Sequence, residues 1–197
     1  MHPYATDSTE RDRLPLWFAG VAIVSAYLLS LVIGKSGYQD RLWWVEVPSV
    51  LGFYKFYFKL FDVWVWKCPR VRQIGALSVP DLSGTWDGDG TTLYDESGAK
   101  PFKCTVTIRQ RWTRIRVWLD TPTSESSSIV GAITVEGRRP SLSYEYFNEP
   151  KALAPPGMNA HRGMTRLELI APDELEGEYY SGRGRQTFGT LGLRRRK

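Results

Sequence analysis

The sequence predicts a membrane-anchored, all-β protein in which two N-terminal hydrophobic helices precede an antiparallel β-barrel of about eight strands. Three observations support this fold class. An apolar run covers residues 14–34, a second, more aromatic run covers residues 46–67, and residues 80–197 alternate apolar and polar side chains with a period of two. The alternating part has about 118 residues, the size of one domain, so we expect a single folded unit after the helices.

The first apolar run has the length of a bilayer-spanning helix. No charged side chain occurs from Leu14 to Ile33, and a helix rises about 1.5 Å per residue, so the run covers the roughly 30 Å of the hydrocarbon core. A cleaved secretion signal has a shorter apolar region, of about 7–15 residues, and ends in a small-residue cleavage pattern that does not follow Ile33. We therefore expect a tail at residues 1–13 and a transmembrane helix at residues 14–34.

Three charged side chains, Lys55, Lys59 and Asp62, interrupt the second run. Each charge near the centre of a span costs about 2.5–3.5 kcal/mol, whereas each large apolar residue contributes only about 0.3–0.6 kcal/mol in favour of insertion. On a helix the three charges fall within an arc of about 60°, so they predict a polar stripe. The stripe either faces partner helices in an assembly, with residues 46–67 as a second span, or faces water while the helix lies at the membrane surface. Either way these three residues are candidates for membrane and oligomer contacts.

Positive charges predict the orientation of the chain. If both runs span the membrane, five Lys and Arg residues flank them on the side of the C-terminal domain and two lie between them, which places that domain in the cytoplasm. The two cysteines, Cys68 and Cys104, lack the spacing of a disulfide framework and fit a reducing compartment. Residues 68–79 are expected to form a short basic linker ahead of the domain at residues 80–197.

The period of two defines about eight strands in the domain. They are expected around residues 84–90, 102–109, 114–119, 128–135, 142–148, 166–169, 175–181 and 187–193. One apolar face per strand and short connections favour an up-and-down barrel, and a two-sheet sandwich is the alternative. The segment Gly84-Thr85-Trp86 resembles the Gly-x-Trp start of lipocalin- and avidin-type barrels, so we expect a lipocalin-like arrangement.

Several polar and aromatic side chains share the register of the apolar core residues. An eight-stranded barrel is either filled by side chains or has room for one small ligand, and rings with hydroxyl or amide groups suit a ligand that carries flat bases and hydrogen-bonding edges. The alternative is that these residues fill the barrel and that their polar groups are paired internally. The candidates for ligand binding on this pattern are Trp86, Gln110, Tyr144, Tyr146, Asn148, Thr165, Tyr179 and Thr187.

The segment from Ser181 to Thr187 places Arg183 and Arg185 between glycines. Two guanidinium groups on a backbone that a ligand can approach closely would suit phosphate oxygens, although an ordinary solvated hairpin turn explains the same pattern. The sequence contains no acid–base pair, metal-ligand spacing or nucleophile triad with an assignable role, so we expect no enzyme, no metal and no cofactor. On the presumed outer face, Trp112 and Trp118 lie among arginines, which a self-association surface would explain.

Several motifs occur in a fixed order after the two hydrophobic runs. They are Asp81-Leu82-Ser83-Gly84-Thr85-Trp86-Asp87-Gly88, Cys104-Thr105-Val106-Thr107-Ile108-Arg109-Gln110, Tyr144-Glu145-Tyr146-Phe147-Asn148-Glu149-Pro150, His161-Arg162-Gly163 and Glu178-Tyr179-Tyr180-Ser181-Gly182-Arg183-Gly184-Arg185-Gln186-Thr187. In this combination the chain resembles the SMODS-associated, two-transmembrane, β-strand-rich effector family of CBASS anti-phage defence.

The resemblance implies a barrel on the cytoplasmic face of the bacterial inner membrane that binds a cyclic dinucleotide, its activating ligand, made by a partner nucleotidyltransferase. It further implies that binding drives homo-oligomerisation and membrane disruption, which kills the infected cell; no polymeric nucleic acid is expected as a partner. The function from a different class that the residues leave open is a lipocalin-like, membrane-tethered carrier or sensor of a hydrophobic small molecule.

Overall fold

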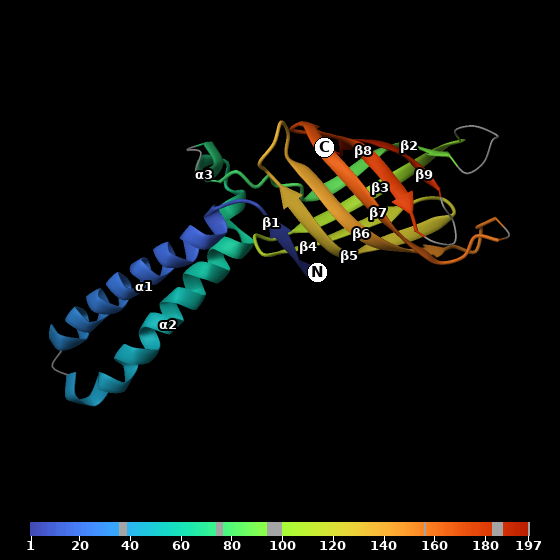
Figure 1. Cartoon of the computed structure of the whole chain (residues 1–197). Helices are drawn as coiled ribbons and strands as arrows, with labels where there is room; N and C mark the ends of the chain where they lie inside the picture. Colours follow the sequence, from blue (N-terminus) through green and yellow to red (C-terminus); the bar gives the residue numbers. More distant parts are fainter. Residues whose placement is uncertain (36–38, 74–76, 94–99, 156, 183–186, 197) are drawn as a thin grey trace. The chain divides into compact units, whose positions relative to one another are not determined.

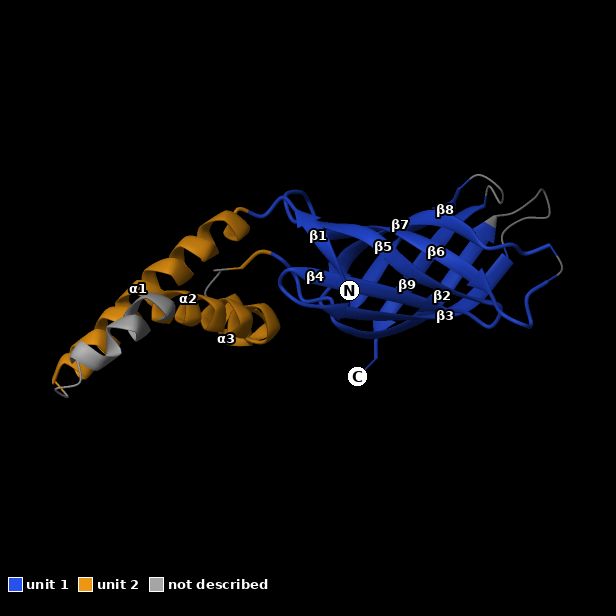
Figure 2. Ribbon diagram, turned by 90° about the horizontal axis from the view of Figure 1, so that it is seen from below, with its two compact units in different colours: residues 1–8, 79–197 blue, residues 9–78 orange. Residues whose placement is uncertain are grey.

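The computed structural model of the 197-residue chain divides into two compact units, residues 1–8 with 79–197 and residues 9–78, shown in blue and orange in Figure 2. The structure describes residues 1–35, 39–73, 77–93, 100–155, 157–182 and 187–196, without the side chains of residues 39–48, Gln73 and Leu93. The predicted all-β class is confirmed for the larger unit. Residues 183–186, which include the predicted phosphate ligands Arg183 and Arg185, lie outside the described part.

The larger unit is a closed barrel in which β2 pairs with both β3 and β9 (Figure 1). The order of the strands is β1-β4-β3-β2-β9-β8-β7-β6-β5, so β2 to β9 follow one another as an antiparallel meander. The strands are β1 His2–Thr6, β2 Gly84–Leu93, β3 Lys100–Gln110, β4 Arg114–Asp120, β5 Ser124–Thr134, β6 Ser141–Pro150, β7 His161–Ala171, β8 Glu174–Ser181 and β9 Phe188–Arg195. Strands β2 to β9 correspond to the eight segments expected from the period of two.

Strand β1 corrects the expectation of a tail at residues 1–13. Its first two residues pair with β4 in antiparallel fashion, and Tyr4 to Thr6 pair with β5 in parallel. Strands β4 and β5 pair directly only between Trp118 and Asp120, and β1 fills the gap where they separate. After the strand, the Asp7 carboxylate accepts hydrogen bonds from the amides of Val135 and Glu136, at 2.8 and 3.0 Å.

Two short turns explain how neighbouring strands reverse direction. Between β4 and β5, the Thr121 hydroxyl accepts a hydrogen bond from the Ser124 amide at 2.9 Å, with Pro122 at the first corner position. Between β7 and β8, only Pro172 and Asp173 separate the paired strands. Such short connections keep sequential strands adjacent.

The two tryptophans expected to form an outer self-association surface are less exposed than that expectation requires. Trp112 is only 3% exposed, although it lies in the turn between β3 and β4. Trp118 is half-buried, with the guanidinium groups of Arg109 and Arg116 at 5.3 and 5.7 Å from its ring. Stacked arginines cover the apolar ring, which removes the reason to expect a protein partner there.

The smaller unit contains the helices α1 Glu10–Lys35, α2 Gln39–Val63 and α3 Pro69–Gln73 and the single turn η1 Val65–Lys67. Among the described residues, α1 is the one helix long and apolar enough to cross a membrane. Helix α2 begins seven residues before the expected start at 46, because residues 39–45 contain no glycine or proline to stop it.

Helices α1 and α2 contact each other through aromatic and polar side chains. The ring centroid of Phe18 lies 5.2 Å from that of Phe61, and the hydroxyls of Ser25 and Tyr57 are 2.8 Å apart. The predicted polar stripe is divided by this packing. Lys55 and Lys59 are exposed in the single chain, whereas Asp62 is buried beside Phe61.

Candidate ligand-binding site

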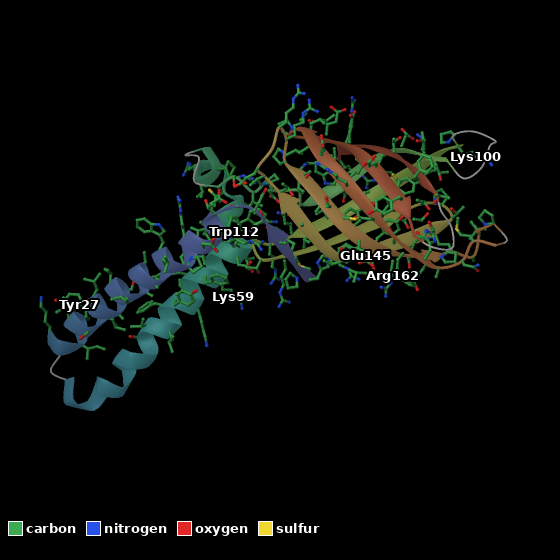
Figure 3. All side chains as sticks on the ribbon, in the orientation of Figure 1. Tyr27, Lys59, Lys100, Trp112, Glu145 and Arg162 are labelled. Carbon is green, nitrogen blue, oxygen red and sulfur yellow. The ribbon has the colours of Figure 1, made fainter. Side chains whose placement is uncertain are left out.

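The barrel contains a cavity of about 520 Å³ at one end. It lies where β6 and β8 end and where β3 and β7 begin, near the end of the barrel where Figure 3 labels Lys100. This volume is within the usual range of about 300–1,000 Å³ for sites that bind small molecules. The lining residues are Thr92, Pro101, Phe102, Lys103, Leu119, Thr121, Pro122, Thr123, Ser124, Ser126, Tyr146, Asn148, Met158, His161, Thr165, Tyr179, Thr187 and Leu191.

Five of the predicted ligand-binding residues come together in this lining. They are Tyr146, Asn148, Thr165, Tyr179 and Thr187. They lie on β6, β7 and β8 and just before β9, in stretches where the inward side chains follow a period of two. The register shift of the β7–β8 pair lies farther along, between Leu169 and Ala171. Alternation therefore placed them on the same face of the sheet, as expected for a pleated strand.

Tyr146 depends on a glycine opposite it in the sheet. It pairs with Gly163 on β7, and a Cβ atom at position 163 would lie 2.2 Å from the Tyr146 hydroxyl oxygen. Only glycine leaves space for the phenol ring at this point. The ring is edge-on to the imidazole of His161, with the centroids 6.4 Å apart, so two flat groups stand beside each other in the cavity wall.

A second aromatic pair in the lining joins β3 and β8. The rings of Phe102 and Tyr179 are edge-on, with centroids 6.2 Å apart. Next to them, the Thr187 hydroxyl is hydrogen-bonded to that of Ser181, and the Ser181 amide donates to the Thr187 carbonyl at 2.7 Å. These bonds join Ser181 to Thr187, on either side of the undescribed residues 183–186.

Two further lining residues, Ser124 and Ser126, were not expected from the sequence. Counting back by two from the buried Ile133 would place Ile129, Ser127 and Glu125 inside. A β-bulge between Ser128 and Val130 adds one residue and reverses the faces, so Ile129 is 40% exposed and the serines face inward. The even-numbered serines do alternate in the sequence, but only the bulge decides which set is inside.

Trp86 and Gln110 lie outside the cavity, at the other end of the barrel. The Gln110 amide accepts a hydrogen bond from the Leu82 amide at 2.8 Å and donates one to the Pro80 carbonyl at 3.0 Å. The Trp86 ring nitrogen donates to the Leu82 carbonyl at 3.0 Å, and the Arg195 guanidinium covers the ring at 4.3 Å. Their polar atoms are used by the protein itself, so they close this end of the barrel.

Tyr144 is also absent from the lining, although it shares the inward face of β6. It is 2% exposed, and burial raises its pKa to about 12, against a smaller opposite effect of the Thr165 side chain. Its hydroxyl approaches Thr165 but makes no hydrogen bond of full geometry with any described residue. Tyr144 therefore lies beneath the cavity as a core residue.

The lining surface is mostly apolar, with polar groups distributed over it and little charge. Twelve of the eighteen lining residues have a hydroxyl, amide, imidazole or amine group, and in the described lining Lys103 is the one permanently charged side chain. Its ammonium group is exposed and 3.8 Å from the Asp89 carboxylate. Within the described residues, no three His, Cys, Asp or Glu side chains come together as a metal site. The arrangement suits a neutral, hydrogen-bonding and flat portion of a ligand inside the barrel.

Comparison with known proteins bears on the whole barrel. Residues 77–195 match the family model described as the Cap15 cyclic dinucleotide receptor domain. A relative from Yersinia aleksiciae, CD-NTase-associated protein 15, is 31% identical over 149 residues, which covers 75% of this chain and 69% of the relative.

Two solved structures are more distantly similar. Rv2717c from M. tuberculosis has a TM-score of 0.37 and 15% identity over 66% of this chain and 99% of that protein. A protein of unknown function from the DUF3598 family of Nostoc punctiforme has the same TM-score and identity over 61% of this chain and half of its own length. Neither similarity adds to what the structure of the barrel itself shows.

The family match covers more than half of the chain, and the Yersinia relative is similar over most of both proteins. The resemblance to a CBASS effector family is thereby confirmed for the receptor domain, while the two-transmembrane arrangement stays a prediction. The chain belongs to the Cap15 family, which is defined by its cyclic dinucleotide receptor domain.

Proposed function

We propose that this chain is a CBASS effector whose barrel binds a cyclic dinucleotide in the end cavity, and that binding drives self-association and disruption of the inner membrane. The observation that carries the proposal is a cavity of about 520 Å³, lined by rings and hydroxyls, inside a domain of the Cap15 family. The protein acts as a receptor rather than an enzyme, with the nucleotide as its activating ligand.

The two aromatic pairs provide surfaces for the two bases of the ligand. Tyr146 with His161 and Phe102 with Tyr179 are two separate ring pairs in the lining of the same cavity. Stacking of a base on an aromatic side chain is worth about 1–3 kcal/mol and tolerates any base. Hydroxyl and amide groups around the rings then read the edges of the bases and the sugars, as Asn148, Thr165 and Ser126 are placed to do.

The phosphates belong nearer the mouth of the cavity, where water still solvates charge. Arg183 and Arg185 fall in the segment that Ser181 and Thr187 enclose, and we assign them the role of phosphate ligands by their chemistry and position in the sequence. A carrier of an apolar molecule is the less favoured function, because the barrel matches the family model of a cyclic dinucleotide receptor domain.

The helices supply the membrane part of the proposal. Helix α1 anchors the chain, with the barrel on the cytoplasmic side, and α2 either spans beside other helices or lies at the surface. Ligand binding favours a barrel state that self-associates, which raises the local concentration of helices in the membrane. The exposed Lys55 and Lys59 then come close to other copies within the bilayer and strain it.

Titration of the full chain in detergent with cyclic di-AMP, cyclic di-GMP and cyclic GMP-AMP tests the site. We expect at least one of them to bind, and Tyr146→Ala to weaken that binding by roughly tenfold to hundredfold, as expected for a lost base stack. Phe147→Ala, the half-buried neighbour on the outer face, is the matched control and retains the wild-type affinity. Absence of binding by all three nucleotides, or equal losses in both variants, would contradict the proposal.

Two further measurements test separate parts of the proposed function. Equal affinity of the wild type and the Arg183→Ala, Arg185→Ala double variant removes these arginines from the site without affecting the role of the cavity. Dye release from vesicles that contain the full chain tests membrane disruption. If the ligand binds but releases no dye, the effector step is wrong and the receptor step stands.

A further inference from the structure

Four arginines gather at the corner where β3 turns into β4, directly after Gln110 at the closed end of the barrel. Arg109 of β3 is paired with Arg116 of β4, and Arg111 and Arg114 lie at the turn, where the Arg111 amide donates to the Arg114 carbonyl at 2.7 Å. Arg109, Arg111 and Arg114 are exposed, and Arg116 is half-buried. In the part of the chain that the structure describes, no carboxylate lies within 4 Å of these four guanidinium groups.

The pairing of Arg109 with Arg116 is unusual, because like charges directly opposite each other on a sheet are destabilising. Stacking of both guanidinium groups on the Trp118 ring, at 5.3 and 5.7 Å, offsets part of this repulsion. Arg116 also donates a hydrogen bond to the Ser127 hydroxyl at 3.1 Å. A planar guanidinium that stacks by its face still presents N–H groups at its edge, so the corner directs positive charge and hydrogen-bond donors outward.

The next turn at the closed end adds to this charge. Arg138 and Arg139 lie between β5 and β6, are exposed, and have no acidic partner within the described ranges. The acidic residues in the turns of this end are Glu136 and Asp173, which the six arginines of the two turns and their flanks outnumber. We call these six residues, Arg109, Arg111, Arg114, Arg116, Arg138 and Arg139, the arginine surface.

The length of the chain keeps the arginine surface close to the membrane if α1 is the anchor. Three residues separate β1 from α1, and the first of them, Asp7, is hydrogen-bonded to the β5–β6 turn. The steps from Asp7 to Glu10 span at most about 11 Å, and the helix rises about 6 Å more to Leu14, where the apolar run begins. The closed end therefore lies within roughly 17 Å of the hydrocarbon, and the headgroup layer occupies about 5–8 Å of that distance.

We propose that the arginine surface binds the phosphate groups of anionic lipids in the leaflet that α1 enters. The inference rests on the proposed function in one respect, namely that α1 anchors the chain. Guanidinium groups bind phosphate oxygens through paired hydrogen bonds, and an anionic leaflet attracts basic residues within a Debye length of about 10 Å. Because the ligand cavity lies at the opposite end of the barrel, this contact holds the mouth of the cavity away from the lipid, toward the solution that supplies the nucleotide.

The observations favour lipid over a nucleic acid strand. Proteins that bind single strands combine basic residues with exposed rings on which bases stack. At this corner the Trp118 ring is already covered by Arg109 and Arg116, and Trp112 is only 3% exposed. The tether to α1 supplies a second reason, because it limits how far the arginines can move from the headgroups.

The test uses the full chain in lipid nanodiscs, one set of neutral phosphatidylcholine and one that also contains anionic phosphatidylglycerol. Gly137→Cys, in a Cys68→Ser background, reports how accessible the closed end is to an uncharged, polymer-linked maleimide. A Cβ atom at position 137 has no neighbour closer than 3.9 Å, so the fold accommodates the change. We expect labelling to be at least tenfold slower in anionic discs, and the difference to shrink at high salt, which screens exposed charges.

Leu153→Cys is the control for the probe. It lies in the loop between β6 and β7 at the cavity end, where the native side chain is 81% exposed. It should react at the same rate in both kinds of disc. Equal labelling of Gly137→Cys in neutral and anionic discs overturns the arginine surface.

A pair of charge-matched double variants tests the arginines themselves. Arg111→Gln with Arg114→Gln should reduce the slowing at Gly137→Cys to about threefold or less, with unchanged nucleotide affinity. Arg162→Gln with Arg166→Gln removes the same charge from the outer face of β7, where Figure 3 labels Arg162, and should leave the slowing intact. Equal losses in the two double variants overturn the assignment. Slowing by an RNA oligonucleotide in neutral discs, with none by anionic lipid, also overturns it in favour of nucleic acid.

Failure of the proposed function gives different results. If neutral discs do not retain the chain, α1 is not an anchor. The surface then stands only if anionic discs bind the wild type at least tenfold more tightly than the Arg111→Gln, Arg114→Gln variant. If the chain is retained and Gly137→Cys is slowed while no nucleotide binds, the receptor proposal is wrong and the lipid surface stands.

Discussion

The Ser128 hydroxyl lies 2.7 Å from Nε2 of the His2 ring, and this contact joins the first strand of the sequence to the bulge in β5. The same hydroxyl accepts a hydrogen bond from the Val117 amide of β4 at 2.9 Å. One buried side chain therefore holds three strands at the point where β4 and β5 separate. Ser128 is 1% exposed. Ser126, which lies two residues earlier on the same face of β5, lines the cavity.

Ser128→Ala should destabilise the barrel by about 1–3 kcal/mol, because the Val117 amide would remain buried without its acceptor. Urea unfolding of the full chain in detergent measures the change. Ser143→Ala, a half-buried serine on the outer face of β6, should change the free energy of unfolding by no more than about 0.5 kcal/mol. Equal effects of the two variants would show that the three-strand contact contributes nothing.

Ser126→Leu should abolish nucleotide binding without loss of stability, since the new side chain fills part of the cavity and buries apolar surface. Calorimetric titration and the melting temperature are measured together. Ser127→Leu is the control, because the next residue along a strand points to the other face of the sheet. Retained binding in Ser126→Leu would place the ligand away from β5.

Gln110→Leu should weaken the fold rather than the site. It leaves the Leu82 amide and the Pro80 carbonyl without partners, at about 1–3 kcal/mol for each buried group. The nucleotide affinity of the folded fraction should stay at the wild-type value, since Gln110 lies outside the cavity lining. Arg111→Leu, at the exposed neighbouring position, is the control for stability. A variant of Gln110 that folds normally and binds poorly would reverse this assignment.

The raised pKa of Tyr144 predicts a specific loss of stability in alkali. An unfolded tyrosine loses its proton near pH 10, whereas burial keeps the Tyr144 hydroxyl neutral in the fold up to about pH 12. Stability is therefore complete below pH 10 and falls as the pH rises from 10 through about 12. Tyr144→Phe should remove this contribution and cost less than about 1 kcal/mol at pH 7, because the hydroxyl makes no full hydrogen bond there. Unfolding at pH 7 and pH 10.5, with Tyr180→Phe as an exposed control, measures both effects.

The two thiols should react at different rates. Burial, with a smaller contribution from the nearby Asp89 and Asp87 carboxylates, raises the pKa of Cys104 to about 11, so little thiolate forms at pH 8. Cys68 is half-buried and should be alkylated by iodoacetamide first, as measured by mass spectrometry under native conditions. Unfolding should remove the difference. Faster labelling of Cys104 in the folded protein would show that the wall of β3 opens.

The alternation of the sequence determined the strands β2 to β9 and the inward face of β6 to β9, because a pleated strand forces successive side chains to opposite faces. It also determined α1, because about 20 residues without a charge can form only a few kinds of structure. The inward positions of Tyr146, Thr165 and Tyr179 follow from this local rule. Their gathering in one cavity lining needed only the pairing of neighbouring strands.

Tertiary structure decided what local periodicity does not encode. A period of two gives the face of a residue but not its height along the barrel, so Trp86 and Gln110 share the inward face and yet close the opposite end. A single bulge at Ser128 turned the serines of β5 inward, and β1 pairs with residues more than a hundred positions away. These features depend on long-range pairing and on one inserted residue, which no short window of sequence contains.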